Sequence, residues 1–269
     1  MGKDSKILWT NHTFNPWIGC TKVSPGCDHC YAERFADTRM GKVVWGPGNR
    51  RIRTAKSTWR QPLAWNRAAA KSGKRTLVFC ASLADVFDDE VPHQWRRALW
   101  GLIESTPDLT WLLLTKRPQN IENMMPPDLI PKVWLGVTVE DQQRADERIP
   151  ILAAMPAPVR FVSCEPMLGE VNLSAWLPIE HGDACGWGPS VLETACMLDG
   201  GTAWRRGINW IICGGESGPN ARPMAEEWAK DLRDQANAAQ IPFLFKQMFL
   251  DNGTKTDILD GTTHREFPP

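Results

Sequence analysis

Short apolar runs, rich in β-branched and aromatic residues, recur along the chain with helix-like stretches between them. The runs cover residues 76–82, 110–115, 133–140, 159–167, 208–217 and 241–248. Nearly continuous apolar runs of this length are typical of strands that a parallel sheet buries on both faces. The intervening helix-like stretches include residues 91–106, 140–155 and 224–240. Strand–helix alternation of this kind predicts βα units around a parallel sheet.

A first strand is expected near residues 12–19, which brings the count to about seven βα units. The predicted fold class is therefore α/β, a complete or partial (β/α) barrel of parallel strands, with a doubly wound open sheet as the alternative. We expect a single domain over residues 1–269. A Gly-rich interruption at about 174–207, which carries Cys185 and Cys196, is interpreted as an inserted loop.

Composition is that of an ordinary globular protein, with 42% hydrophobic and 23% charged residues in 269. No run of about twenty apolar residues occurs, so we expect no membrane span. The N-terminus has no apolar run after its charges and does not resemble a signal peptide. We expect a cytoplasmic protein, in which thiols stay reduced and clustered cysteines indicate metal or redox chemistry.

The formal net charge of zero conceals an asymmetry. Residues 38–84 contain eleven Lys and Arg and no acidic residue, so the rest of the chain holds 20 bases against 31 acids. Trp45, Trp59 and Trp65 lie among these bases. Cations for phosphates and flat rings for nucleobases favour a nucleic-acid surface, with a solvated basic face as the alternative. The candidate contacts of a nucleic-acid substrate are Arg50, Arg51, Arg53 and Trp59.

Three cysteines, Cys20, Cys27 and Cys30, follow one another in the spacing C-x6-C-x2-C. Thiolate triads bind zinc or iron–sulfur clusters. A zinc site would need a fourth ligand such as His12 or His29, and no second C-x-x-C or H-x3-H occurs in the chain. A [4Fe-4S] cluster on three cysteines leaves one iron open to a cofactor or substrate. The spacing favours the cluster, and a zinc-stabilised nucleic-acid-binding protein without catalysis is the alternative.

Polar residues end each predicted strand, where ligands of parallel α/β folds gather. Among them, Glu140, Glu165 and Glu216 are candidate substrate contacts, together with Arg222. For Glu216 and Arg222, the packing of a tight turn is an equal alternative.

Several motifs carry a resemblance to a known family. The segments "FNPWIGC", "GCDHCYAERFA", "FCASLADVF", "LLLTKRP", "WLGVTVE", "CEPMLG" and "CGGESGPNARPM" resemble the radical S-adenosylmethionine (SAM) superfamily. More narrowly, they are similar to a phage-borne family of three-cysteine proteins of uncharacterised function. The common superfamily spacing is C-x3-C-x2-C, whereas the first gap here is six residues. The resemblance implies that SAM binds the open iron through its amino and carboxylate groups and is cleaved to a 5′-deoxyadenosyl radical. It also implies an external electron donor such as flavodoxin.

Similarity to the spore photoproduct lyase family implies roles for single residues. Cys80 would donate a hydrogen atom to a substrate radical, and strand alternation would place Cys80 on one interior-facing side with Val78 and Ser82. The residues that would contact SAM are His29, Tyr31, Ser82, Asp85, Lys116 and Thr138. The implied function is a radical SAM enzyme that repairs or modifies a nucleic-acid base, with DNA favoured over RNA.

Overall fold

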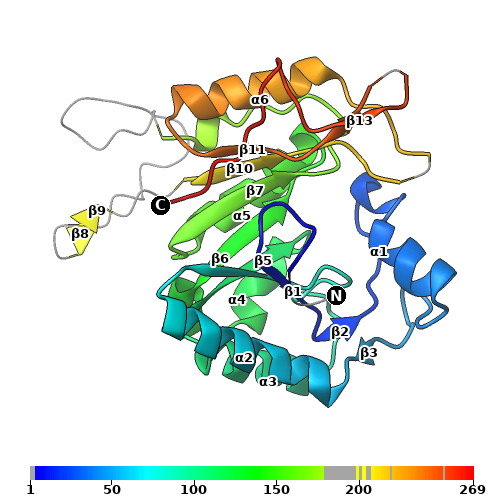
Figure 1. Ribbon diagram of the computed structural model, residues 1–269, viewed down its shortest axis with the longest axis vertical. Helices are drawn as coiled ribbons and strands as arrows, with labels where there is room; N and C mark the ends of the chain where they lie inside the picture. Colours follow the sequence, from blue (N-terminus) through cyan, green and yellow to red (C-terminus); the bar gives the residue numbers. More distant parts are fainter. Residues whose placement is uncertain (1–3, 179–197, 200–201, 204–206, 219, 251) are drawn as a thin grey trace.

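Seven parallel strands form the sheet at the centre of the computed structural model, which describes residues 4–178, 198–199, 202–203, 207–218, 220–250 and 252–269. The strands lie side by side in chain order: β1 (His12–Phe14), β4 (Thr76–Cys80), β5 (Leu109–Thr115), β6 (Val133–Thr138), β7 (Val159–Cys164), β10 (Trp210–Cys213) and β11 (Phe243–Phe245). The sheet curls into a half-barrel (Figure 1). Because the order never reverses, a doubly wound sheet is ruled out and the predicted partial (β/α) barrel is confirmed.

Helices cover the outer face of the curled sheet (Figure 1). They are α2 (Lys56–Ser72), α3 (His93–Glu104), α4 (Ile121–Met124), α5 (Gln142–Ala154) and α6 (Glu226–Ala238), while α1 (Tyr31–Glu33) lies beyond the cysteines. Three short strand pairs complete the described strands: β2 (Trp17–Ile18) with β3 (Ile52–Arg53), β8 (Leu198–Asp199) with β9 (Thr202–Ala203), and β12 (Met248–Phe249) with β13 (Lys255–Thr256). No helix among the described residues is long and apolar enough to cross a membrane.

The two faces of the sheet belong to two separate apolar cores. Alternate strand residues such as Val78 and Leu113 pack with helix residues, including Leu99 of α3 and Leu232 of α6. The opposite set forms the interior of the half-barrel, where Leu77, Phe79, Leu112, Trp134 and Phe161 pack around Trp9. The Trp9 and Phe79 rings lie 4.4 Å apart between centroids. The N-terminal segment therefore fills part of the space that a closed barrel would give to further strands (Figure 1).

Most sequence-predicted elements are present with shorter bounds, because polar residues after each strand already belong to loops. Helix α2, which lies in the basic segment, was not singled out from the sequence. The expected insert at 174–207 lies mainly outside the described residues, as do Cys185 and Cys196.

Gly136 of β6 tests the packing of the half-barrel interior. A Cβ atom at this position would lie 2.4 Å from the ring of the fully buried Phe161. We expect Gly136→Ala to lower the free energy of unfolding by about 1–3 kcal/mol through overpacking. The matched control is Gly101→Ala on α3, where nothing lies within 4 Å and alanine favours the helix by about 0.5–1 kcal/mol. Chemical denaturation of both variants checks this, and equal stability changes would contradict the packing described here.

Candidate functional site

A cavity of about 810 Å³ opens at the carboxyl ends of the strands, within the size range of ligand pockets. Loops that follow β4, β5, β7, β10 and β11 contribute to its wall, and the cysteine loop, residues 19–30, lies across it. The predicted site residues that line this cavity are Cys20, Cys27, His29, Cys30, Tyr31, Ser82, Asp85, Lys116, Thr138, Glu165 and Glu216. The fold thus brings together residues that are up to 196 positions apart, as the strand-end argument predicted.

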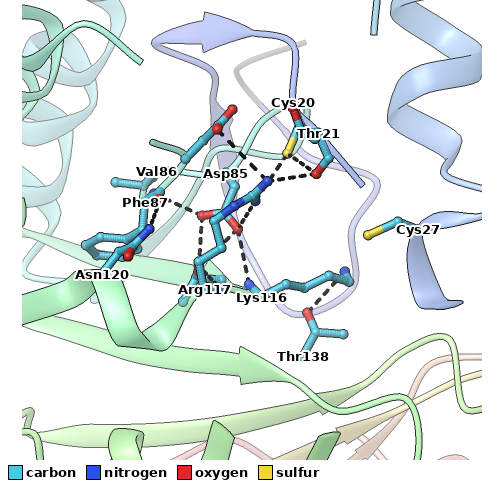
Figure 2. A network of polar contacts seen from close by, with 12 residues as sticks. Cys20, Thr21, Cys27, Asp85, Val86, Phe87, Lys116, Arg117, Asn120 and Thr138 are labelled. Carbon is cyan, nitrogen blue, oxygen red and sulfur yellow. Dashed lines mark hydrogen bonds and ion pairs between the residues drawn. The ribbon is translucent and has the colours of Figure 1, made fainter. Parts of the chain in front are cut away.

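Arg117, which follows β5, anchors the first arm of the cysteine loop (Figure 2). Its guanidinium donates to the Cys20 Sγ atom at 3.5 Å and to the Thr21 carbonyl at 2.7 Å. The same group pairs with the Asp85 carboxylate at 3.1 Å and lies 3.9 Å from Asp88. Arg117 is 4% exposed, so burial opposes its charge, but the carboxylates raise its pKa above the ordinary value. It is a permanent cation that fixes Cys20 at the sheet edge.

Asp85 has no capacity left for a cofactor amine. One carboxylate oxygen accepts from the Thr115 hydroxyl and the Phe87 N–H, and the other from the Lys116 N–H and Arg117. A carboxylate offers about four lone-pair sites, and these four donors occupy them (Figure 2). The expected SAM contact at Asp85 is therefore replaced by a structural role at the end of β5.

Arg51 is buried and does not belong to a nucleic-acid surface. Its side chain is fully covered and pairs with Asp88 at 2.7 Å. It also donates to the Thr21 hydroxyl at 2.6 Å and to the Gly46 and Asn49 carbonyls. The expected substrate contact at Arg51 is wrong, because this guanidinium is used to hold the cysteine loop against the loop after β4.

Glu140, which follows β6, supports the middle of the cysteine loop. Its carboxylate is fully buried, pairs with Arg148 of α5 at 2.8 Å and accepts a hydrogen bond from the Ser24 hydroxyl. A Cβ atom on Gly26 would lie 2.3 Å from the Glu140 side chain, so only glycine fits there. Glu140 does not reach the cavity, and the expected substrate contact at this residue is wrong.

Glu216, which follows β10, supports the part of the cysteine loop that contains Pro25 and His29. It accepts from His29 at 2.8 Å and forms a two-point ion pair with Arg222, whose closest contact is 2.6 Å. Arg222 also donates to the Pro25 carbonyl at 2.9 Å. Burial favours the protonated form of Glu216, but the hydrogen bonds from Arg222 and His29 lower its pKa below the ordinary value. Of the two alternatives for this pair, the contacts favour local packing, directed at the cysteine loop.

Several polar groups remain directed at the cavity. Among the described residues, the Lys116 ammonium donates a hydrogen bond only to the Thr138 hydroxyl, at 3.4 Å. Burial raises the pKa of Cys30, and the charge of Lys116 opposes that rise. The Ser82 hydroxyl accepts from the Asn15 amide at 3.0 Å, and the Tyr31 hydroxyl donates to the Ser82 carbonyl at 2.6 Å. Glu165 pairs with Lys246, which follows β11.

Cys80 faces away from the cavity. It is fully buried with Val78 in the helix-facing core, whereas Phe79, Ala81 and Ser82 line the cavity. Strand alternation ends with β4 at Cys80, so it does not carry over to Ser82. The predicted common face of Val78, Cys80 and Ser82 inside the barrel is therefore wrong. A thiol in this position cannot reach a substrate in the cavity, and we do not retain Cys80 as a hydrogen donor.

The basic segment, residues 38–84, is arranged differently from the nucleic-acid surface that the sequence predicted. Trp45 and Trp65 are buried, and Trp59 packs edge-on against Phe14 with the Arg53 guanidinium over its ring at 4.5 Å. Trp59 and Trp65 pack against other rings and are not free to stack on bases, whereas Trp45 lines the cavity. All the segment's cations except Arg51 are exposed, including Arg50 and Arg53.

Helix α2 arranges part of this charge in a stripe. Lys56, Arg60, Arg67 and Lys71 are exposed and separated by four, seven and four residues. At 3.6 residues per turn, their side chains fall within roughly 60° of one another on the helix surface. We call these four residues the α2 stripe.

The three thiols line one cavity but do not form a ready site for a single ion. No set of three or more His, Cys, Asp or Glu among the described residues is arranged to hold a metal ion. Burial raises the pKa of Cys20 to about 12, as does Asp85, with Arg117 opposing. A metal centre that binds Cys20 must therefore displace the proton of this thiol.

The chain belongs to the family described as protein of unknown function (DUF5131), which matches residues 4–268. Comparison with curated proteins finds no match. Among solved structures, a spore photoproduct lyase mutant with dinucleoside spore photoproduct matches at 14% identity and a TM-score of 0.44, over 62% of this chain and 48% of that one. The chain thus spans about half the length of this structure. A second mutant, with bound AdoMet and the same dinucleoside, matches at 10% identity and a TM-score of 0.48, over 95% and 70%.

The pairing of Glu216 with Arg222 predicts a pH-dependent stability. The folded-state pKa of Glu216 is lowered from 4.5. Its contribution to the stability of the fold is therefore fully present above pH 4.5 and is lost as the pH falls through the folded-state pKa. We expect Glu216→Gln to cost about 2 kcal/mol at pH 7 and a smaller amount near pH 3. Urea unfolding at both pH values measures the difference.

The control for Glu216→Gln is Glu226→Gln, which breaks an exposed pair with Lys230 on α6. This variant should change stability by less than about 0.5 kcal/mol at either pH. A cost for Glu216→Gln that stayed the same at both pH values would contradict the ionised pair.

Proposed function

We propose that this protein is a radical SAM enzyme that acts on a nucleic-acid base, with DNA favoured over RNA. The observation that carries the proposal is the position of Cys20, Cys27 and Cys30. All three line one cavity at the carboxyl edge of a partial (β/α) barrel, in a loop that ion pairs hold from β5, β6 and β10. A [4Fe-4S] cluster on these thiols, with SAM and an external electron donor such as flavodoxin, would supply a 5′-deoxyadenosyl radical.

The residues around the thiols have separate tasks in this proposal. Lys116 has an ammonium with one hydrogen-bond partner, beside the cysteine loop, and would hold the SAM carboxylate. Ser82, Tyr31 and Thr138 offer hydroxyl groups on the same wall. His29 is fixed by Glu216 and would border the adenine. Glu165 with Lys246 bounds the side of β7 and β11, where the substrate would enter.

The α2 stripe, with Arg50 and Arg53 at its N-terminal side, would bind the phosphate backbone of the substrate. A row of exposed cations over about 22 Å of helix, without an intervening acid, matches the repeated charge of a nucleic-acid strand. The neutral chain as a whole has no such excess, so the attraction would be local to this surface.

Iron binding tests the cluster. After anaerobic reconstitution, we expect about four irons per chain and a brown protein, and loss of both in Cys20→Ala, Cys27→Ala or Cys30→Ala, because a cubane held at two corners is labile. Cys80→Ala is the matched control and should retain iron, since this thiol lies in the helix-facing core. Iron analysis and the visible spectrum give the result. A colourless protein with one zinc would instead support the alternative, a zinc-stabilised nucleic-acid-binding protein.

Salt dependence tests the α2 stripe. The double variant Arg60→Ala with Arg67→Ala should weaken binding of single-stranded DNA and reduce the log–log salt slope by about one unit for each phosphate that is no longer neutralised. The charge-matched control is Arg144→Ala with Arg233→Ala, because both arginines pair with neighbouring carboxylates on α5 and α6. Fluorescence anisotropy at several salt concentrations provides the measurement. Equal slopes in the two double variants would show that the α2 stripe does not bind phosphates.

A further inference from the structure

Gln247 is a buried amide that faces the cavity without a partner. It follows β11, is 3% exposed and lines the cavity with Ser163 and Lys246. Its Nε2 atom has no hydrogen-bond partner among the described residues. The neighbouring Lys246 ammonium pairs with Glu165, and the Gln247 carbonyl of the main chain accepts a hydrogen bond from the Gly215 N–H at 2.7 Å.

An unpaired buried amide is costly, because its N–H has lost its hydrogen bond to water without gaining another. Of the described side chains with such an unpaired atom, only Trp9 and Gln247 line the cavity. The Trp9 indole N–H is likewise a donor, 2% exposed, on the inner wall of the half-barrel. Unpaired donors in one cavity indicate a ligand that presents hydrogen-bond acceptors there.

Two carboxylates that line the cavity with Gln247 are already paired. Glu165 pairs with Lys246 and Glu216 pairs with Arg222, so the unpaired amide is the group left for a neutral polar ligand. A carboxamide carries a donor and an acceptor side by side, which matches the donor and acceptor edge of a nucleobase. The ring systems of Trp9 and Phe79 form an apolar wall in the same interior.

We propose that Gln247 is a specificity-determining residue that hydrogen-bonds the edge of a nucleobase in the cavity. The proposal rests on the proposed function, because either of its two ligands could bring that base: the nucleic-acid substrate or the adenine of SAM. In both cases the base edge satisfies an amide that the fold leaves unpaired.

The stability of Gln247→Leu separates recognition from a structural role. Leucine removes an unpaired polar group from a buried position, so the melting temperature of the protein should stay constant or rise. The matched control is Gln235→Leu on α6, because the Gln235 amide accepts from the Leu173 N–H at 2.6 Å and donates to the Val171 carbonyl at 3.0 Å. That control should lower the melting temperature, since two backbone groups would be left without their partners.

Binding measurements on the reconstituted protein decide the proposal. One arm titrates SAM by calorimetry; the other compares single-stranded DNA pentamers that carry each base in turn, or an abasic site, at the centre. If the substrate brings the base, the wild type should bind its preferred pentamer about tenfold more tightly than the abasic one, and Gln247→Leu should abolish that preference. If SAM brings it, Gln247→Leu should weaken SAM binding about tenfold and leave the pentamers unchanged.

Two results overturn the inference, and they differ in what else they affect. The role of Gln247 alone would be overturned if Gln247→Leu bound SAM and the pentamers as the wild type does. It would also be overturned if Gln247→Leu bound all pentamers equally more weakly and had a melting temperature as low as that of Gln235→Leu. A wild type that binds neither SAM nor any pentamer would overturn the proposed function and this inference with it.

Discussion

The buried ion pair between Arg117 and Asp85 is the interaction on which the site depends. It joins the end of β5 to the loop after β4, and through Arg117 it reaches Cys20 and Thr21. Asp88 extends the pair to Arg51, so that two guanidiniums and two carboxylates form one buried network of balanced charge. Buried pairs of this kind contribute little net stability but become costly when one partner is removed. We interpret the network as a device that positions the cysteine loop.

The same device recurs along the carboxyl edge of the sheet. Arg148 with Glu140 holds Ser24, and Arg222 with Glu216 holds His29 and the Pro25 carbonyl. Each carboxylate follows or lies near the end of a different strand, while each contact is made with a different part of the cysteine loop. Six residues separate the first two cysteines, so the loop is long. Three anchored points along it explain how thiols in such a loop can line one cavity.

Much of the fold could be predicted from the sequence, because buried parallel strands are recorded directly as apolar runs. The cysteine triad and the strand-end residues Lys116 and Thr138 could also be placed near one cavity by topology alone. The burial of Arg51 could not be predicted, since it depends on Asp88, which is distant in the sequence and has no local signal. Alternation failed at Ser82, because the two-residue period holds only while the strand continues.

Residues that position other residues could not be identified from the sequence. In the sequence, Arg117 is one of several polar residues that follow a strand. Its neighbours in the sequence do not show whether it is buried against the cysteine loop or exposed at the edge of the cavity. Gln247 could be noticed only once the structure had shown an amide without a partner in a shared cavity. Helix α2 was obscured by its charge, although the spacing of Lys56, Arg60, Arg67 and Lys71 contains the helical period.

The central claim is that the thiols of this loop hold a cluster at which SAM is cleaved. The most direct measurement is the release of 5′-deoxyadenosine from SAM by the anaerobically reconstituted protein under a strong reductant, followed by chromatography. We expect release by the wild type, reduced release in Lys116→Ala through weaker SAM binding, and none in Cys27→Ala. A reconstituted wild type that contains the full complement of iron, binds SAM and releases no 5′-deoxyadenosine above the Cys27→Ala background would contradict the account.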